Sequence, residues 1–291
     1  MLLRTLVSQL TEQFTEAGIE APRAEAEVLI SEVLDINRGQ LNSLIITEGS
    51  ADASQLQTIL AFAARRAARE PLQHLTGRAY FRNLVLSVGK GVFIPRPETE
   101  LLAQLGIDAL REAGTASPDQ RLLAFDLGTG SGAIALSLAT EVPAATVHAV
   151  EYSDDAYPWT TKNFETYRAL GADANLRQGD LRDAFAEFNG QADVVVTNPP
   201  YIPVDMVPIY PEVALHDPAL ALYGGQDGLD LVRAASQTGL RLLKSGGFFA
   251  VEHADIQGPS VVELLRNDGW ISVTQHQDFN QRDRVVSAVR P

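Results

Sequence analysis

Three features that many proteins use are missing from this chain of 291 residues. It has no cysteine, which excludes disulfides, thiolate zinc sites and a cysteine nucleophile and fits a reducing compartment. It has no stretch that is long and apolar enough to span a membrane. Its first ten residues are soon followed by Glu12 and Glu16 and lack the continuous apolar core of a secretion signal. We therefore expect a soluble cytoplasmic protein.

Acidic residues outnumber basic ones in the C-terminal two thirds of the chain. The net charge of −14 lies in residues 97–291, because the 10 basic and 10 acidic residues of 1–96 cancel. Binding a phosphate backbone usually needs a basic face. The acidic C-terminal part therefore argues against nucleic acid as the main partner, although a generally acidic proteome would explain the charge equally well.

The N-terminal part of the chain is predicted to be helical. Apolar residues keep helical spacing from Leu3 to Phe14, Gly18 ends that helix, and Pro22 can begin a second. A third helix is predicted from about Ser54, with arginines near its end that suit the helix dipole. This bundle is either a structural cap or a module that docks a macromolecular substrate, and its residues favour neither.

A hairpin and a further helix are expected next. Residues 77–89 alternate in polarity and carry β-forming residues, which predicts the hairpin. Glu98 and Glu100 open a helix that runs to about Ala113, since acids suit a helix N-terminus. A stretch rich in Ser, Pro and Gly over 114–118 separates this helix from the next strand.

From Arg121 the chain alternates strands and helices, which predicts a mostly parallel sheet covered on both faces. The expected strands are 122–126, 146–151, 175–178, 193–197, 247–252, 271–276 and 285–289. The connection 277–284 is too short for a right-handed crossover, so the last two strands should be antiparallel. Such a sheet is more typical of class I methyltransferases than of plain dinucleotide-binding folds. Residues 202–228 carry four prolines, and we interpret this long loop as a lid over the site.

A glycine-rich turn follows the first predicted strand. Gly128, Gly130 and Ala133 match the G-x-G-x-x-[G/A] pattern, in which glycines let a ligand approach the backbone at a helix N-terminus. Asp126, just before the turn, would repel a pyrophosphate but attract the amino group and sulfonium of S-adenosylmethionine. Gly132 makes the turn more open than phosphate binding needs. The alternative is a tight turn without a ligand.

Acids follow the next two predicted strands. Glu151 ends the second strand, where it can accept hydrogen bonds from both ribose hydroxyls. Asp180 follows the third strand and can accept from the adenine amino group, with Leu181 packed on the ring. Asn198 closes the set after the fourth strand. Because parallel strands share one carboxyl edge, these residues would line a single ligand. The alternative for Glu151 is a solvated acid at a strand end.

The tetrapeptide Asn198-Pro199-Pro200-Tyr201 must end the fourth strand, because neither proline can donate a ladder hydrogen bond. The Asn198 side-chain oxygen and the Pro199 carbonyl can each accept one N–H of a planar NH₂ group. This holds the nitrogen with its lone pair aimed at the donor methyl, and it stabilises the charge that grows there. Tyr201 can stack on the planar group. We therefore predict catalytic roles for Asn198, Pro199 and Tyr201 and substrate binding by all four residues.

Seven blocks of the sequence resemble the release factor N(5)-glutamine methyltransferases, which methylate the Gly-Gly-Gln glutamine of peptide chain release factors. The blocks are 71–77, 93–100, 126–135, 198–202, 224–230, 252–253 and 283–285. They cover most of residues 71–291, whereas the N-terminal helices agree in character only. The tetrapeptide is shared with N(6)-adenine DNA methyltransferases, but the block around Arg96 is far more specific.

The resemblance implies a helical substrate-docking domain (1–75), a β-hairpin linker (76–96) and a methyltransferase domain (97–291). That last domain would have a seven-stranded, mostly parallel sheet with an antiparallel last strand. The resemblance also implies S-adenosylmethionine as donor, S-adenosylhomocysteine as product, release factors as partners, and a monomer without metal, membrane or direct nucleic-acid contact. The implied donor contacts are Gly128, Thr129, Gly130, Ser131, Gly132, Glu151, Asp180, Leu181 and Asn198.

Some positions depart from the family pattern. Glu151 stands where Asp is more frequent, Leu181 where some members have an aromatic residue, and Asp217 where many have Glu. Residues 157–159, Tyr-Pro-Trp, are expected to interrupt the helix after the second strand. Residues 224–226 copy the substrate's Gly-Gly-Gln; we interpret them as a glycine turn before a helix, with self-methylation as the alternative.

Three other functions stay open at this point. The same chemistry could act on a glutamine of a ribosomal protein, a choice that the helical domain would decide. A nucleic-acid adenine methyltransferase would need a basic groove and a target-recognition domain, and neither is visible in the sequence. A dinucleotide-dependent oxidoreductase or a non-catalytic nucleotide-binding module is opposed by Asp126 and by the tetrapeptide.

Overall fold

A computed structural model describes residues 1–116, 120–208 and 210–291 of the chain. The described residues form two compact units. The first, called the helical unit below, contains Met1–Arg78 together with helix α9 (Pro211–His216). The second, the catalytic unit, contains Ala79–Pro208 and Asp217–Pro291. The predicted domain limits at 75 and 96 remain a prediction.

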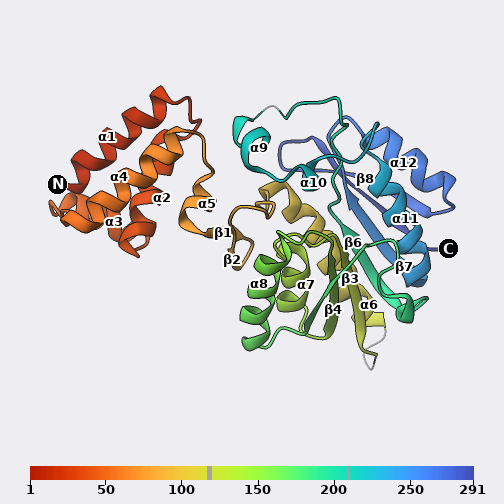
Figure 1. Cartoon of the computed structure of the whole chain (residues 1–291). Coiled ribbons are helices and arrows are strands. Elements are labelled where there is room, and N and C mark those ends of the chain that lie inside the picture. Colours follow the sequence, from red (N-terminus) through yellow and green to blue (C-terminus); the bar gives the residue numbers. More distant parts are fainter. Residues whose placement is uncertain (117–119, 209) are drawn as a thin grey trace. The chain divides into compact units, whose positions relative to one another are not determined.

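The helical unit confirms the helical character of the N-terminal part (Figure 1). Its helices before α9 are α1 (Leu3–Glu16), α2 (Pro22–Leu34), α3 (Arg38–Ile46), α4 (Ala53–Ala67) and α5 (Leu72–Thr76). Leu6, Leu10 and Phe14 of α1 are fully buried in one core with residues of α2 and α4. Neither α3 nor α5 was predicted as a separate helix.

The predicted hairpin lies at the start of the catalytic unit, where β1 (Arg78–Phe81) pairs with β2 (Leu84–Ser87); only the first residue of β1 belongs to the helical unit. A short 3₁₀ helix, η1 (Pro97–Thr99), then leads into α6 (Glu100–Ala116). Because α6 extends to Ala116, the predicted break is wrong for residues 114–116. Residues 117 and 118 lie outside the described part of the chain.

A seven-stranded sheet has the order β5-β4-β3-β6-β7-β9-β8. Its strands are β3 (Leu122–Leu127), β4 (Ala145–Glu151), β5 (Ala174–Gln178), β6 (Ala192–Thr197), β7 (Leu243–Glu252), β8 (Ile271–Gln277) and β9 (Asp283–Val289). The first five strands of this order are parallel, and β9 runs antiparallel to both β7 and β8. The predicted fold class, including the antiparallel last strand, is confirmed.

Helices cover both faces of this sheet (Figure 1). The helices that follow its strands are α7 (Ala133–Glu141), α8 (Tyr157–Ala169), α11 (Asp230–Leu242) and α12 (Gly258–Asn267). Val194 and Val196 of β6 pack in the core with α6 and α7, whereas Val195 packs in the core with α11 and α12. This alternation explains why the three consecutive residues at the centre of β6, 194–196, are all apolar.

Two details differ from the sequence-based expectation. Tyr157 begins α8 and Pro158 lies in its first turn, so the prediction that 157–159 interrupt the helix is wrong. A proline is tolerated there because the first N–H groups of a helix have no partner within it. The 202–228 segment is not a plain loop either, because it contains α9 and α10 (Ala219–Leu222).

No helix in the described ranges is long and apolar enough to cross a membrane. Among the same residues, no group of three or more His, Asp or Glu side chains is placed to hold a metal ion.

Candidate active site

The predicted site residues lie where neighbouring strands of the sheet end. Asp126 of β3 is in register with Ala149 of β4 and Val196 of β6, and Glu151 of β4 is in register with Gln178 of β5. Asn198 directly follows β6, and Asp180 lies two residues after the end of β5. These strands are adjacent and parallel, so the structure brings all four polar residues to one carboxyl edge.

The glycine turn after β3 leaves room for a ligand. Gly128, Gly130 and Gly132 have φ angles of 78°, 57° and 88°, a region that favours glycine. A Cβ atom added at Gly128 or Gly130 would meet no described atom within 4 Å, whereas one at Gly132 would lie 2.9 Å from the Phe164 ring. Gly132 is thus required by packing, and the first two glycines leave open space beside the backbone.

Asp126 is the buried acid of this turn. Its Oδ2 accepts hydrogen bonds from the Thr129 hydroxyl at 2.6 Å and from the Ala135 backbone N–H at 3.1 Å. Its Oδ1 is buried without a hydrogen-bond partner among the described residues. Burial raises the pKa of Asp126 to about 7, and the nearby Glu151 adds to this shift. One carboxylate oxygen is therefore unsatisfied at the position where a positively charged ligand group was predicted.

Glu151 contacts the same turn from β4. Its Oε2 accepts from the Gly130 N–H at 2.8 Å and its Oε1 from the Ser153 N–H at 2.8 Å. Burial raises the pKa of Glu151, and these backbone hydrogen bonds oppose the increase. Each oxygen keeps a second lone pair, so the carboxylate supports the turn and can still accept a hydroxyl group.

Two residues that the sequence reading missed also hold the turn. The Asn163 amide of α8 donates to the Ser131 carbonyl at 2.9 Å and to the Ser87 carbonyl at 3.0 Å. The Thr160 hydroxyl bonds to the Gly130 carbonyl. Ser131 and Thr129, two of the predicted donor contacts, are both buried. Their side chains therefore face the protein interior, on the side of the turn that α8 supports. Such bracing depends on tertiary contacts that no local pattern reveals.

Asp180 and Leu181 are less accessible to a ligand than the prediction of adenine contacts implies. Asp180 accepts from the Arg182 backbone N–H at 2.9 Å and from its guanidinium at 2.7 Å. Leu181 is 8% exposed and belongs to the core on the α11 side. Their adenine contacts remain a prediction, with only a small part of the Leu181 side chain available to a ring.

The tetrapeptide after β6 presents two unused acceptors. The Asn198 Nδ2 group donates to the Thr99 hydroxyl at 3.2 Å. No described residue donates to Asn198 Oδ1 or to the Pro199 carbonyl. Asn198 is partly exposed and Pro199 is buried. Two free acceptors on consecutive residues match the two N–H groups of a planar NH₂.

Tyr201 points its hydroxyl inward although the residue as a whole is partly exposed. The hydroxyl lies 3.5 Å from Glu252 Oε1 at the end of β7, and burial raises the pKa of Tyr201. The Tyr201 carbonyl accepts from Gln257 Nε2 at 2.9 Å. Gln257 and Glu252 thus hold the backbone and the hydroxyl group of Tyr201. The stacking of Tyr201 on a substrate remains a prediction.

The internal Gly-Gly-Gln has a structural explanation. A Cβ added at Gly224 would lie 2.3 Å from the Pro200 carbonyl oxygen, and one at Gly228 would lie 2.1 Å from that of Tyr201. These glycines therefore let the segment pack directly on the tetrapeptide backbone. The exposed Gln226 lies between them, before α11 begins at Asp230. The predicted glycine turn is confirmed, and self-methylation stays untested.

The block around Arg96 contacts the 202–228 segment at Asp217, between α9 and α10. Arg96 Nη2 lies 2.6 Å from Asp217 Oδ2, whose side chain is 1% exposed. The Arg96 guanidinium also lies over the Phe93 ring, 5.2 Å from its centroid. Asp217, where many family members have Glu, therefore pairs with the most family-specific block of the sequence.

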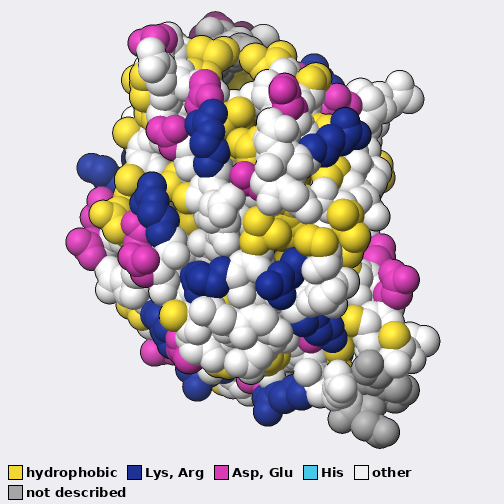
Figure 2. All heavy atoms as spheres, turned by 90° about the vertical axis from the view of Figure 1, so that its right-hand side faces the viewer, with side chains coloured by type: hydrophobic (Ala, Val, Ile, Leu, Met, Phe, Trp, Pro, Cys, Tyr) yellow, Lys and Arg dark blue, Asp and Glu magenta, His cyan; other side chains and the backbone are white. Residues whose placement is uncertain are grey.

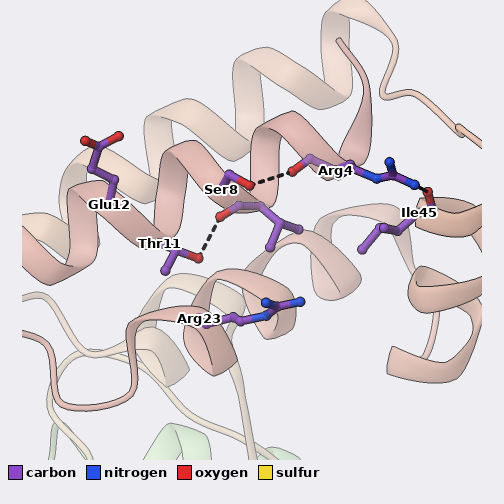
Figure 3. A pocket seen from close by; sticks show the side chains of 7 residues that line it. Arg4, Ser8, Thr11, Glu12, Arg23 and Ile45 are labelled. Carbon is purple, nitrogen blue, oxygen red and sulfur yellow. Dashed lines mark hydrogen bonds between the residues drawn. The ribbon is translucent and has the colours of Figure 1, made fainter.

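A surface pocket elsewhere contains none of these residues. It has a volume of about 500 Å³ and is lined by residues of α1, α2 and α3, among them Arg4, Thr11 and Arg23 (Figure 3). The Thr11 hydroxyl donates to the Val7 carbonyl of its own helix at 2.7 Å. This pocket belongs to the helical unit and does not mark the strand-end site.

The catalytic unit shows mixed charge on the side where α11 and α12 lie in Figure 1. In Figure 2, Lys and Arg side chains are spread over this side among acidic and hydrophobic ones. They do not gather into a single basic patch there. This face therefore lacks the continuous basic surface that electrostatic binding to a phosphate backbone requires.

The strand order, the antiparallel β9 and the glycine turn beside Asp126 define a class I methyltransferase. Residues 5–77 match the PrmC N-terminal domain and residues 106–205 the methyltransferase small domain. A release factor glutamine methyltransferase of Streptomyces coelicolor is 47% identical over 289 residues, which are 99% of this chain and 98% of that relative. The chain belongs to the release factor glutamine methyltransferase family.

Other relatives extend the comparison. The 4-amino-L-phenylalanine/4-methylamino-L-phenylalanine methyltransferase of Streptomyces pristinaespiralis is 37% identical and covers 99% of this chain and 95% of its own. A methyltransferase of Pyrococcus furiosus shares the fold at 16% identity, with a TM-score of 0.51 over 82% of this chain and 99% of that one. A T. Thermophilus 16S rRNA methyltransferase, solved with AdoMet and guanosine, has a TM-score of 0.50 at 22% identity, over 74% of this chain and 50% of that one.

Proposed function

We propose that this protein methylates the side-chain amide nitrogen of the Gly-Gly-Gln glutamine in peptide chain release factors, with S-adenosylmethionine as donor. The observation that carries this proposal is the pair of free acceptors, Asn198 Oδ1 and the Pro199 carbonyl, at the carboxyl edge that also holds the glycine turn. Family membership supports the choice of substrate.

The residues around the glycine turn fit the donor. S-adenosylmethionine supplies a methyl group activated on a positively charged sulfur. Asp126 Oδ1, buried without a partner among the described residues, would accept from its ammonium group. Glu151 would accept from its ribose hydroxyls, and Gly128 and Gly130 leave the space it needs. We assign Thr129, Ser131 and Gly132 to the shape of this turn, and Asp180 and Leu181 to the adenine end.

The acceptor residues act by position and charge. A primary amide is a poor nucleophile because its lone pair is delocalised, and its N–H groups are too weakly acidic for a general base to help. Asn198 and Pro199 would hold both N–H groups, which fixes the nitrogen for in-line attack and stabilises the positive charge that develops on it. Pro200 and Tyr201 would form the wall of this pocket.

The test is methyl transfer to purified release factor, with a variant of the factor that lacks the Gly-Gly-Gln glutamine as control. We expect methylation of the intact factor and no methylation of the variant. Asn198→Ala should lower the rate by about 100-fold or more, the scale found when one oriented donor or acceptor is removed. Binding of S-adenosylhomocysteine should be largely kept. Equal loss of binding and rate would mean that Asn198 serves mainly the donor.

The Streptomyces pristinaespiralis relative supplies a second candidate, because its name describes methylation of an aromatic amine. Two free acceptors can hold an arylamine NH₂ as well as an amide NH₂. The same assay should therefore include 4-amino-L-phenylalanine. Turnover of this compound without turnover of the release factor would replace the first candidate by the second.

We also assign substrate docking to the helical unit, which matches the PrmC N-terminal domain. An intact release factor can contact this unit, whereas a short Gly-Gly-Gln peptide reaches only the acceptor pocket. The KM for the peptide is expected to be at least about 10-fold above that for the intact factor, since extra contacts lower KM. Equal KM values would assign the helical unit a structural role only.

A further inference from the structure

Exposed apolar side chains collect at the edge of the sheet that holds the acceptor residues. They are Val204, Met206 and Val207 after β6, Ile256 after β7, and Phe279 in the turn between β8 and β9. We call these five residues the apolar rim. At the opposite edge of the sheet, only Leu170 and Ile271 are large, apolar and exposed among the described residues. Exposed apolar surface is thus concentrated beside the acceptor residues, whereas singly scattered residues would need no explanation.

The strand register places all three of these connections at one edge. Glu252 at the end of β7 pairs with Val285 near the start of β9, and Gln277 at the end of β8 pairs with Asp283. Strand β6 is parallel to β7, so Asn198, directly after β6, lies at the same edge. The predicted donor residues belong to the ends of β3, β4 and β5, on the other side of β6 in the strand order. The apolar rim therefore flanks the acceptor residues on the side away from the donor.

The turn that carries Phe279 is held in shape by its neighbour Asp278. The Asp278 carboxylate accepts from the backbone N–H groups of Asn280 at 2.9 Å and of Arg282 at 3.1 Å, and from the Arg284 guanidinium at 3.3 Å. The Asp278 N–H donates to the Arg282 carbonyl at 2.9 Å, which closes the turn. Asp278 is buried, whereas Phe279 is 95% exposed. A hydrogen-bonded turn thus presents an aromatic side chain to the surroundings with little contact to the rest of the chain.

The connection that carries Ile256 joins this turn to the acceptor site. Ile256 is 71% exposed and lies next to Gln257, whose side chain donates to the Tyr201 carbonyl at 2.9 Å. The Arg284 guanidinium, which contacts the turn between β8 and β9, also donates to the His253 carbonyl at 3.4 Å. Hydrogen bonds therefore link the apolar rim to the tetrapeptide.

We propose that the apolar rim docks the protein substrate, by contacting apolar side chains of the release factor beside the loop that carries the glutamine. A glutamine in a folded protein can reach Asn198 only if the surface around it lies against the connections at this edge. Aromatic side chains are enriched at such contacts because they bury a large area with few rotatable bonds. This inference rests on the proposed function, and it adds a docking surface on the catalytic unit to the one assigned to the helical unit.

Two other occupants fit this surface less well. Residues 97–291 carry the whole net charge of −14, which opposes binding to the anionic lipids that attract peripheral proteins. A second copy of the chain on the apolar rim would lie beside the acceptor residues and hinder the entry of a macromolecular substrate. The tests below separate both occupants from a protein substrate.

The first test replaces Phe279 by alanine. The KM for the intact release factor should rise by about 10-fold, the scale of one lost aromatic anchor, with kcat nearly unchanged because Phe279 does not touch the reacting groups. Ile256→Ala should raise the same KM by about 3-fold, as a weaker contact of the same surface. Leu170→Ala, 76% exposed at the opposite edge, is the matched control and should leave KM unchanged. Equal KM values for Phe279→Ala and Leu170→Ala, in an enzyme that methylates the factor, would overturn the inference.

A short Gly-Gly-Gln peptide separates docking from an effect on the acceptor pocket. The peptide cannot reach Phe279, so its KM should be the same for Phe279→Ala and the wild type. A similar rise for the peptide and the factor would mean that the turn shapes the pocket, and it would refute docking. Failure of the wild type to methylate the factor at all would count against the proposed function, and the inference would fall with it.

Binding without turnover identifies the occupant. In calorimetry with S-adenosylhomocysteine present, the wild type should bind the intact release factor about 10-fold more tightly than Phe279→Ala. The wild type should also sediment as a monomer and should not bind vesicles of phosphatidylcholine and phosphatidylglycerol. A dimer that Phe279→Ala dissociates would assign the apolar rim to a second copy, and vesicle binding that it abolishes would assign the rim to a membrane. Either result would contradict docking of a protein substrate.

Discussion

Arg66 in the helical unit and Asp126 in the catalytic unit are both buried charges, but only Arg66 has partners of opposite charge. Its guanidinium lies 2.5 Å from Glu25 and 2.9 Å from Glu212 of α9. Burial acts to lower the pKa of Arg66, and these two glutamates raise it. Asp126 has no ion pair among the described residues, and one of its oxygens has no hydrogen bond.

The difference separates a buried charge that the fold pairs from one that it leaves without an ion pair among the described residues. In the helical unit the fold supplies the counter-charge, so the ion pairs contribute to that unit's own stability. In the catalytic unit Asp126 and Glu252 are both fully enclosed, and the pKa of each is raised to about 7, chiefly by burial. An enclosed carboxylate with an unsatisfied oxygen lowers stability, which is expected where a ligand or substrate completes the site.

The largest expected effect is on donor binding by Asp126→Asn. The substitution keeps the size of the side chain but removes the charge that would hold the donor's ammonium group. Affinity for S-adenosylhomocysteine should fall by about 100-fold, as when one partner of a buried charge pair is lost. Calorimetry measures this, with the exposed Asp183→Asn as a matched control. Unchanged affinity would mean that the unsatisfied oxygen serves another purpose.

The next largest effect is on the stability of the helical unit. Arg66→Met should lower the free energy of unfolding by about 2–4 kcal/mol, because it leaves Glu25 and Glu212 without their buried cation. The control is Arg65→Met, whose exposed pair with Glu70 should contribute less than about 1 kcal/mol. Urea unfolding of the full chain compares them, and similar losses would erase the contrast between buried and exposed charge.

The pH dependence of stability tests the catalytic side. Because the pKa of Glu252 is raised to about 7, the folded protein binds more protons than the unfolded chain between pH 5 and pH 7, so stability falls as pH rises through this window. Glu252→Gln removes this contribution and should be more stable than wild type at pH 8 by about 1–3 kcal/mol. Thermal unfolding at pH 5 and pH 8 measures the difference. A variant that is less stable at pH 8 would show that the carboxylate is better satisfied than its burial indicates.

The smallest effect concerns α9. Glu212 also pairs with Arg69 at 2.7 Å, and its side chain is 17% exposed. Glu212→Gln should cost about 1 kcal/mol, because an amide keeps part of the hydrogen bonding and water reaches the pair. Hydrogen exchange should be faster in α9 and little changed in α11, since only α9 belongs to the helical unit. Faster exchange in both helices would contradict that assignment.

The fold was largely predictable, since strand periodicity and connection length are local signals. The apolar run of β6, the glycines after β3 and the short link before β9 gave the sheet and its antiparallel last strand. The helix α3 could also have been found, because Asn37 and Gln40 form a capping box at its start. The prediction of a helix break at 157–159 failed because Pro158 lies in the first turn of α8, where a proline does not interrupt a helix.

The position of a candidate site residue was predictable where that residue lies at a strand end. Asp126, Glu151 and Asn198 fall into this class. Thr99 is 99 residues from Asn198, and Glu252 is 51 residues from Tyr201, so their contacts exist only after folding. Both residues lie in sequence blocks typical of the family, but the sequence does not reveal which side chain of the tetrapeptide each of them contacts.

Helix α9 makes the helical unit discontinuous in sequence. The chain enters the catalytic unit after Arg78 and contributes Glu212 to the helical unit more than a hundred residues later. An isolated fragment of residues 1–78 would therefore keep buried Arg66 with Glu25 alone and would present the Glu212-binding side of Arg69 to water. Binding measurements on that fragment would examine a surface that the intact chain covers, so a peptide carrying α9 should be supplied in trans.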